Sequence, residues 1–277
     1  MKFFSSIGCM QGRLSPMLKG KIQSFPEKNW RKEFFYARKL KLKFIEWTLD
    51  YKNLYKNPIF QEKNIIEIKR LCKKNSIKVI SLTGDCFMQR PFWKIKNSIS
   101  KHIINFKKIV SACNSIGIKF IVIPLVDKGS IKTMQQEKKI ISLMKKFSRF
   151  IKKKKIFILF ESDYAPHRLK LFIKKFDKKI FGINYDTGNS AYMGYNLEEE
   201  FRCYGEYIKG VHIKDRVFNG KSVRLGRGDV DFGKFFIQLK KIKYKNHLIL
   251  QTARSVKNKD IQEIKKNLEY IKQWIQK

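Results

Sequence analysis

Four short hydrophobic segments in the second half of the chain each end in a polar side chain that can bind a metal ion. The end residues are Glu161, Asp186, His212 and Gln251, at intervals of 25, 26 and 39 residues. Carboxylate oxygens, an imidazole nitrogen and an amide carbonyl together suit Mn²⁺, Mg²⁺, Co²⁺ or Zn²⁺. Such an ion acts as a Lewis acid on a carbonyl or enediolate oxygen. The pattern predicts one metal-assisted site; the simpler alternative is that the acids cap helices and His212 lies in the core.

Parallel strands that alternate with helices would bring these residues to one rim. Because successive side chains of a strand point to opposite faces, His212 and Lys214 would both face the barrel axis. The hydrophobic periodicity predicts eight strands, at residues 3–9, 44–49, 77–83, 120–124, 156–161, 181–186, 208–214 and 247–251. It predicts eight helices, at residues 30–40, 62–74, 98–116, 133–153, 166–176, 197–204, 231–242 and 260–275. Residues 84–92 are expected to form a rim loop. The alternation predicts a single (β/α)8 barrel over residues 1–277, with an open doubly wound sheet as the alternative.

The composition is that of a globular protein with a large core. Of the 277 residues, 43% are hydrophobic, yet no apolar run reaches the roughly 18 residues that a membrane helix needs. The first ten residues predict a strand rather than a signal segment. The five cysteines form no Cys-x-x-Cys pair, which favours a reducing cytoplasm over a disulfide framework or a zinc ribbon. We therefore expect a cytoplasmic protein that does not bind membranes.

The chain is strongly basic. Lys and Arg number 62 and Asp and Glu 23, for a formal net charge of +39. Such an excess is found in proteins that bind nucleic acid or anionic membranes. The basic residues are spread over nearly all predicted helices, and Lys, Ile, Asn and Phe are inflated together, as an AT-rich coding sequence would produce. The distribution favours compositional drift over polyanion binding as the source of the charge.

Short motifs along essentially the whole chain resemble one family. They are IGCMQGRLSP, FIEWTLD, SLTGDCFM, FESD, NYDTGNSA, GVHIKDR, LGRGDVDFGKFF and LILQTAR. With these motifs the chain resembles the sugar phosphate isomerase/epimerase group, the xylose isomerase-like TIM barrels. The resemblance implies a divalent-metal-dependent enzyme that isomerises or epimerises a sugar or sugar phosphate through an enediolate. It also implies that exposed barrel faces pair into a homodimer.

The resemblance implies roles for individual residues as well. Glu161 lies at the position of a residue that is both metal ligand and catalytic base, and Asp186 and His212 lie at the positions of two further ligands. Asn189 stands where relatives often carry a histidine. Arg227 matches a loop position that is often used for substrate contact.

Gln251 departs from the family pattern, because ketose epimerases typically have a glutamate there that is both fourth ligand and second base. An amide cannot abstract a proton. A proton shuttle between neighbouring carbons needs only one base, which Glu161 could supply. Gln251 therefore favours an isomerase, or a related lyase or dehydratase, over a two-base epimerase. It also leaves open a barrel that binds a sugar without turnover.

Several polar residues near the strand ends are candidates for substrate contact. Barrels often bind phosphate at the ends of strands seven and eight, where this chain has Lys214, Arg216, Arg224, Arg227 and Arg254. A sugar phosphate or a sugar acid would suit these cations. Glu46, in strand two, and Asp85, after strand three, are further candidates.

A nucleic-acid enzyme is the least favoured alternative. Endonuclease IV shares this barrel, and the positive charge would suit DNA. That enzyme needs a histidine-rich cluster of three metals. Of the four histidines here, only His212 lies at a predicted strand end.

Overall fold

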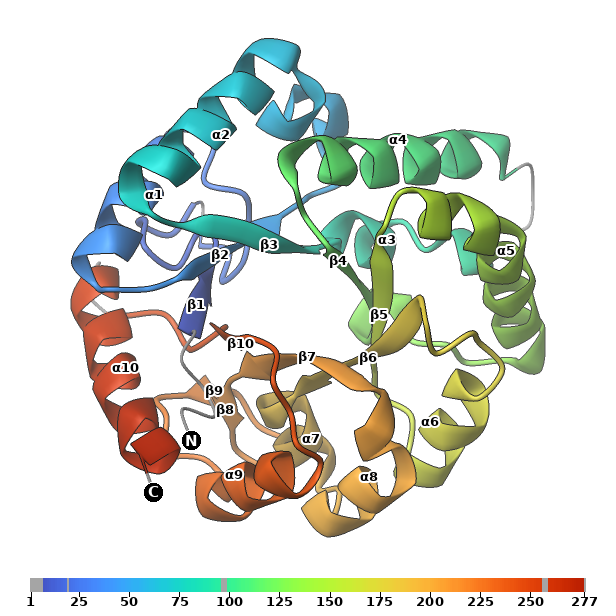
Figure 1. Ribbon diagram of the computed structural model, residues 1–277. Coiled ribbons are helices and arrows are strands. Elements are labelled where there is room, and N and C mark those ends of the chain that lie inside the picture. The colour runs from blue at the N-terminus through green and yellow to red at the C-terminus, as the bar shows by residue number, and fades with distance from the viewer. Residues whose placement is uncertain (1–6, 19, 96–98, 256–258, 277) are drawn as a thin grey trace.

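The computed structural model describes residues 7–18, 20–95, 99–255 and 259–276. Eight parallel strands close into a barrel in the order β1-β10-β7-β6-β5-β4-β3-β2, with helices around it (Figure 1). They are β1 (Ile7–Met10), β2 (Phe44–Thr48), β3 (Lys78–Thr83), β4 (Phe120–Leu125), β5 (Phe157–Ser162), β6 (Phe181–Asp186), β7 (Ile208–Ile213) and β10 (Leu248–Leu250). The predicted (β/α)8 barrel is confirmed, and the open sheet is excluded because β1 pairs with both β2 and β10.

The helices between the strands also follow the predicted pattern. They are α1 (Trp30–Lys39), α2 (Glu62–Asn75), α4 (Ser100–Ile116), α5 (Met134–Lys153), α6 (Pro166–Ile173), α8 (Leu197–Tyr204), α9 (Phe232–Lys241) and α10 (Asp260–Gln276). In α5, Ile140, Met144, Phe147 and Ile151 recur at three- and four-residue spacing and are buried. The Thr133 side chain accepts a hydrogen bond from a backbone N–H of the first turn and caps this helix.

Short elements at the rim lie outside the predicted pattern. α3 (Asp85–Gln89) occupies most of the segment predicted as a loop, and α7 (Thr187–Met193) follows β6 directly. β8 (Asp215–Arg216) and β9 (Ser222–Val223) form a small antiparallel hairpin after β7. Elements this short carry too little periodicity to be detected from sequence. The amino-terminal part of the predicted first strand, residues 3–6, lies outside the described residues.

Aromatic rings fill the amino-terminal end of the barrel interior. The ring of His247, just before β10, lies 5.8 Å from that of Phe44 in β2 and 5.2 Å from that of Phe120 in β4, between centroids. Because these strands are not neighbours, the rings meet inside the barrel. Burial lowers the pKa of His247 to about 4. This imidazole is therefore neutral and belongs to the core, at the opposite end from the strand-end residues.

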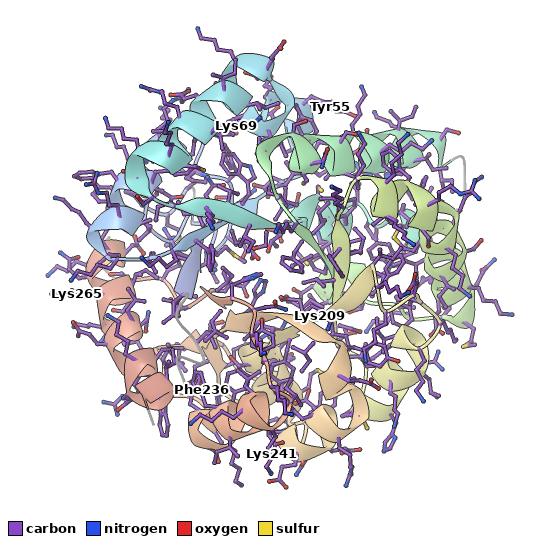
Figure 2. All side chains as sticks on the ribbon, in the orientation of Figure 1. Tyr55, Lys69, Lys209, Phe236, Lys241 and Lys265 are labelled. Carbon is purple, nitrogen blue, oxygen red and sulfur yellow. The ribbon has the colours of Figure 1, made fainter. Side chains whose placement is uncertain are left out.

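Lysine side chains project from helices around the barrel (Figure 2). Lys69, Lys241 and Lys265 lie on α2, α9 and α10, three separate helices. This spread agrees with the interpretation of the charge as a property of composition. In the described part of the chain, no helix is both long enough and apolar enough to cross a membrane.

Candidate active site

The ends of β5, β6 and β7 bring Glu161, Asp186 and His212 together. One possible ligand atom from each residue lies within 4.8 Å of the other two, and all three side chains are buried. Asp186 is paired with His212 in the register of β6 and β7. The barrel thus gathers one imidazole and two carboxylates at the carboxyl ends of three successive strands.

His212 lies between two carboxylates. Its Nε2 is 2.8 Å from Oε1 of Glu46, and its Nδ1 is 2.9 Å from Oε2 of Glu161. Thr83 donates a 2.6 Å hydrogen bond to the same Glu46 oxygen. Burial alone would lower the pKa of His212, but the two carboxylates raise it to about 10. Burial likewise raises the pKa of Glu46, and the imidazole overcomes this and holds that pKa below its ordinary value.

Two amides orient the carboxylate of Glu161. Asn184 Nδ2 donates to Oε2 and Asn189 Nδ2 donates to Oε1, each at 2.9 Å. Burial raises the pKa of Glu161, but His212, Lys214 and Asn184 lower it by more, so the net shift is downward. The carboxylate is therefore ionised at neutral pH.

The two oxygens of Asp186 have different partners. Oδ1 accepts a 2.8 Å hydrogen bond from the Asn189 N–H and so caps α7. Oδ2 lies 2.8 Å from Lys214 Nζ and 4.0 Å from His212 Nδ1. The helix-cap alternative weighed from the sequence is thus true of one oxygen, whereas the other oxygen faces the cluster.

A row of polar side chains continues from Lys214 across the barrel mouth. Lys214 Nζ lies 3.4 Å from Gln251 Oε1, and Gln251 Nε2 donates to Gln23 Oε1 at 2.9 Å. Gln23 Nε2 donates to Asp85 Oδ2 at 2.6 Å. These bonds hold the Gln251 carbonyl oxygen toward Lys214. Burial raises the pKa of Asp85 to about 7, so this carboxyl is partly protonated at neutral pH.

The residues present fit a divalent metal ion. Asp186 Oδ2 and His212 Nδ1 are buried and face the cluster, where their neighbours are charged groups: Lys214 Nζ at 2.8 Å and Glu161 Oε2 at 2.9 Å. Because Glu46 engages Nε2 of the imidazole, Nδ1 is the nitrogen directed at the cluster; a carboxylate commonly orients a metal-binding histidine in this way. Glu161 and the carbonyl oxygen of Gln251 would complete a mixed oxygen and nitrogen donor set.

The basic residues near strand ends seven and eight do not form one group. Arg254 donates from Nη1 to Gly12 O, and from Nη2 to Ser15 O at 2.6 Å. Arg224 forms a 2.9 Å ion pair with Glu263 of α10. Both guanidinium groups are thus engaged in holding segments of the chain together.

Lys214 and Arg216 are the basic residues that lie beside the cluster. Arg216 stacks on the ring of Tyr192 at 3.8 Å and donates to Asn189 Oδ1 at 3.4 Å. Arg227 is exposed in a turn where its N–H bonds to a backbone carbonyl. Of the five candidates, Lys214 contacts Asp186 directly, and Arg216 is connected to Glu161 through Asn189.

We expect Arg254→Met to lower stability. The buried guanidinium loses two hydrogen bonds to carbonyls, each worth about 1.5–3 kcal/mol for a charged donor, and its contact with Asp260. Arg224→Met is the matched control, since its guanidinium is 60% exposed and its ion pair is worth less than about 1 kcal/mol. Urea unfolding followed by circular dichroism measures both losses. Equal losses in the two variants would contradict the structural role of Arg254.

The loop after β1 contributes residues that the sequence patterns do not predict. Arg13 donates from Nε to Thr252 O at 3.0 Å, between positions 239 residues apart. Glu33 of α1 accepts hydrogen bonds from the Gly12 N–H at 2.9 Å and from Ser15 Oγ at 2.8 Å. These bonds hold the loop that presents Gln23 to the site. In the sequence, Gly12, Arg13 and Ser15 belong to the motif IGCMQGRLSP, but the motif gives no indication of their contacts.

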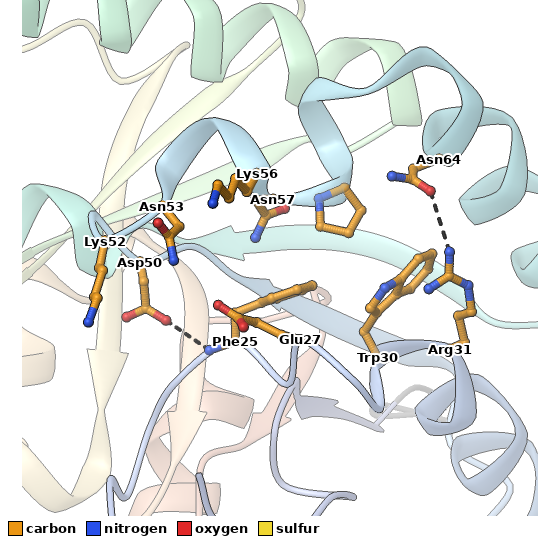
Figure 3. A pocket seen from close by; sticks show the side chains of 11 residues that line it. Phe25, Glu27, Trp30, Arg31, Asp50, Lys52, Asn53, Lys56, Asn57 and Asn64 are labelled. Carbon is orange, nitrogen blue, oxygen red and sulfur yellow. Dashed lines mark hydrogen bonds between the residues drawn. The ribbon is translucent and has the colours of Figure 1, made fainter. Parts of the chain in front are cut away.

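A polar cavity of 340 Å³ lies beside the barrel mouth, between α1 and the segment after β2 (Figure 3). Two of its charged groups, Asp50 and Arg31, are bonded to their neighbours. Asp50 accepts a hydrogen bond from the Phe25 N–H at 2.8 Å, and Arg31 contacts Asn64 and pairs with Glu67. Its described lining contains no histidine or cysteine. We assign no chemistry to this cavity.

His167, Glu199 and Cys203 form a second cluster, on α6 and α8. The imidazole lies between the other two side chains, with Nε2 3.1 Å from Glu199 and Nδ1 3.8 Å from Cys203 Sγ. The thiol and the carboxylate thus approach different nitrogens of the imidazole. One imidazole cannot bind the same ion through both nitrogens. The arrangement is a hydrogen-bonded bridge between two helices.

Comparison with known proteins identifies the class. The family described as xylose isomerase-like TIM barrels matches residues 34–274, and this chain belongs to that family. A search among curated proteins found no significant match.

Several solved structures share the fold. D-allulose 3-epimerase from Methylomonas sp., in complex with D-allulose, has a TM-score of 0.73 at 16% identity and covers 98% of each chain. The 3-keto-D-glucoside 4-epimerase of E. coli has a TM-score of 0.70 at 17% identity, over 97% of this chain and 99% of that one. The IolI protein with a bound zinc atom has a TM-score of 0.71 at 17% identity, over 95% of this chain and 96% of that one. At these identities the similarity establishes the fold.

Proposed function

We propose that this protein is a divalent-metal-dependent isomerase or epimerase of a sugar or sugar phosphate. The observation that carries the proposal is the convergence of Glu161, Asp186 and His212, with ligand atoms within 4.8 Å of one another at the carboxyl end of the barrel. Active sites of such barrels lie at that end. Two structures with the same fold are sugar epimerases, and a third contains zinc, which supports the same interpretation.

Glu161 is the base in this proposal. Its carboxylate is ionised and held by Asn184 and Asn189, so it can take a proton from the carbon next to a sugar carbonyl and return it to the neighbouring carbon. Asp186, His212 and Gln251 would hold the metal together with Glu161. When bound, the ion supplies Lewis-acid stabilisation of the negative charge that develops on the sugar oxygens.

Gln251 favours transfer by one base. Its amide has no titratable proton, and its Nε2 is already bonded to Gln23. Inversion at a carbon commonly uses a base on each face, whereas a shift between neighbouring carbons needs a single base on one face. We therefore favour an isomerase over an epimerase, with a barrel that binds sugar without turnover as the second candidate.

Metal content tests the proposal. Wild type and the variants Glu161→Gln, Asp186→Asn and His212→Ala are purified from Mn-supplemented medium without a chelating resin and measured by mass spectrometry. We expect near-stoichiometric metal in wild type and loss of metal in the Asp186 and His212 variants. Glu67→Gln, which removes a carboxylate on α2, is the matched control and should keep the metal.

Folded wild-type protein that takes up no Mn²⁺, Co²⁺, Mg²⁺ or Zn²⁺ would overturn the metal-dependent mechanism. Sugar binding without metal would then favour the second candidate.

A further inference from the structure

We propose that Lys214 and the divalent ion compete for Asp186, and that the ion, once bound, frees Lys214 to bind an anionic group of the substrate. This inference rests on the proposed function. It makes Lys214 a link between metal binding and substrate binding, and it assigns the substrate to the phosphorylated or acidic sugars.

The competition follows from shared oxygens. Lys214 Nζ lies 2.8 Å from Asp186 Oδ2 and 3.4 Å from Gln251 Oε1. Both oxygens belong to the donor set described above, in which a metal would bind at about 2.0–2.2 Å from a carboxylate oxygen. An ion bound to both oxygens would therefore overlap with the present position of the ammonium group. Two cations this close in a buried site also repel each other strongly.

The side chain of Lys214 packs against Gly188 and is partly exposed to solvent. The Lys214 backbone is fixed, since its N–H donates to Thr187 Oγ1 at 2.9 Å, whereas its side chain is 14% exposed. A Cβ at Gly188 would lie 2.8 Å from Lys214 Cγ and 3.1 Å from Arg216 Cγ. Gly188 thus makes space for both side chains to run past it next to each other.

Arg216 lies where it can bind an anion together with a displaced Lys214. Its guanidinium bonds to Gly220 O at 2.9 Å and to Asn189 Oδ1 at 3.4 Å, both uncharged acceptors, and stacks on Tyr192. A planar guanidinium with an ammonium group beside it suits the oxygens of a phosphate or carboxylate. Asn189 connects this pair to Glu161, so a bound anion would lie close to the proposed base.

Thermodynamic linkage makes the idea measurable. If the ion displaces Lys214 from Asp186, and an anion binds the displaced ammonium, each ligand must raise the affinity for the other by the same factor. Removing the ammonium group removes both the competition and the coupling. The prediction therefore concerns equilibrium binding and does not require a known substrate.

The test measures Mn²⁺ affinity from the electron paramagnetic resonance signal of free Mn²⁺, in wild type and in Lys214→Met. We expect Lys214→Met to bind Mn²⁺ about tenfold more tightly or better, because a nearby positive charge is removed. Lys209→Met, near the amino-terminal end of β7 (Figure 2), is the matched control and should leave the affinity unchanged. Sulfate, the anionic probe, should tighten Mn²⁺ binding in wild type and not in Lys214→Met.

The outcomes separate this inference from the proposed function. Equal or weaker Mn²⁺ binding by Lys214→Met, with wild type binding normally, overturns the competition and leaves the metal-dependent enzyme intact. Coupling to sulfate that persists in Lys214→Met overturns the anion role. Failure of both folded proteins to bind any of Mn²⁺, Co²⁺, Mg²⁺ and Zn²⁺ overturns the proposed function as well. Mn²⁺ binding by Lys214→Met but not by wild type would show that Lys214 excludes the ion from the site, and would support the competition.

Discussion

Replacing Glu161 with glutamine is expected to slow exchange of the substrate proton with solvent by about 10²- to 10⁴-fold, the usual contribution of a general base. Glutamine has nearly the same shape as glutamate but cannot accept the proton. The measurement is deuterium uptake from D₂O, followed by proton NMR, with ketoses, aldoses and their phosphates in the presence of Mn²⁺. Wild type should incorporate deuterium at the carbon next to the carbonyl.

The control must separate loss of the base from loss of the ion, since Glu161 has both roles in the proposal. Exchange is therefore measured at saturating Mn²⁺, with bound metal determined in the same samples. Glu67→Gln, which removes a carboxylate remote from the site, should keep the wild-type rate. Glu161→Gln that retains metal and exchanges at the wild-type rate would show that another group is the base.

Replacing Glu46 with alanine should have a large effect on stability, a decrease in the free energy of unfolding of about 3–5 kcal/mol. Glu46 and His212 form an ion pair at 2.8 Å with side chains 1% and 0% exposed. Removing one member of a buried pair leaves the other with an uncompensated polar group. Urea unfolding of the metal-free protein measures the loss.

Glu46→Gln gives the matched comparison. Its amide oxygen can still accept hydrogen bonds from His212 and Thr83, so the loss should be smaller than for alanine. The alanine variant should also bind Mn²⁺ about 10- to 100-fold more weakly, since Glu46 orients the imidazole. A stability loss below about 1 kcal/mol for Glu46→Ala would contradict the ion pair.

Hydrophobic periodicity and the polar strand ends were sufficient to predict the barrel and the proximity of Glu161, Asp186 and His212. Hydrophobic periodicity is a local property, and it located β6 and α8 at their observed bounds. In a barrel of parallel strands, a polar residue at the end of a strand must lie at the shared rim. Glu161, Asp186 and His212 were therefore predictable as neighbours without knowledge of any contact between them.

The same local reasoning did not reach the short rim elements. α7 begins directly after Asp186, and its seven residues include too few apolar positions to show a helical face. Its position depends on the cap that Asp186 provides and on the hairpin beside it. Asn189, on the first turn of α7, contacts Glu161 for this reason.

The partners of the charged side chains, in contrast, could not be predicted from the sequence. Five basic residues near strand ends seven and eight were equivalent in the sequence, yet Lys214 reaches Asp186 whereas Arg254 holds the loop after β1. Glu46 and His212 meet although 166 positions separate them. The reason is physical: a long side chain bonds to whichever acceptor the closed barrel places within its reach. The paths of the loops and the conformations of the side chains fix those distances, and the spacing of hydrophobic residues encodes neither.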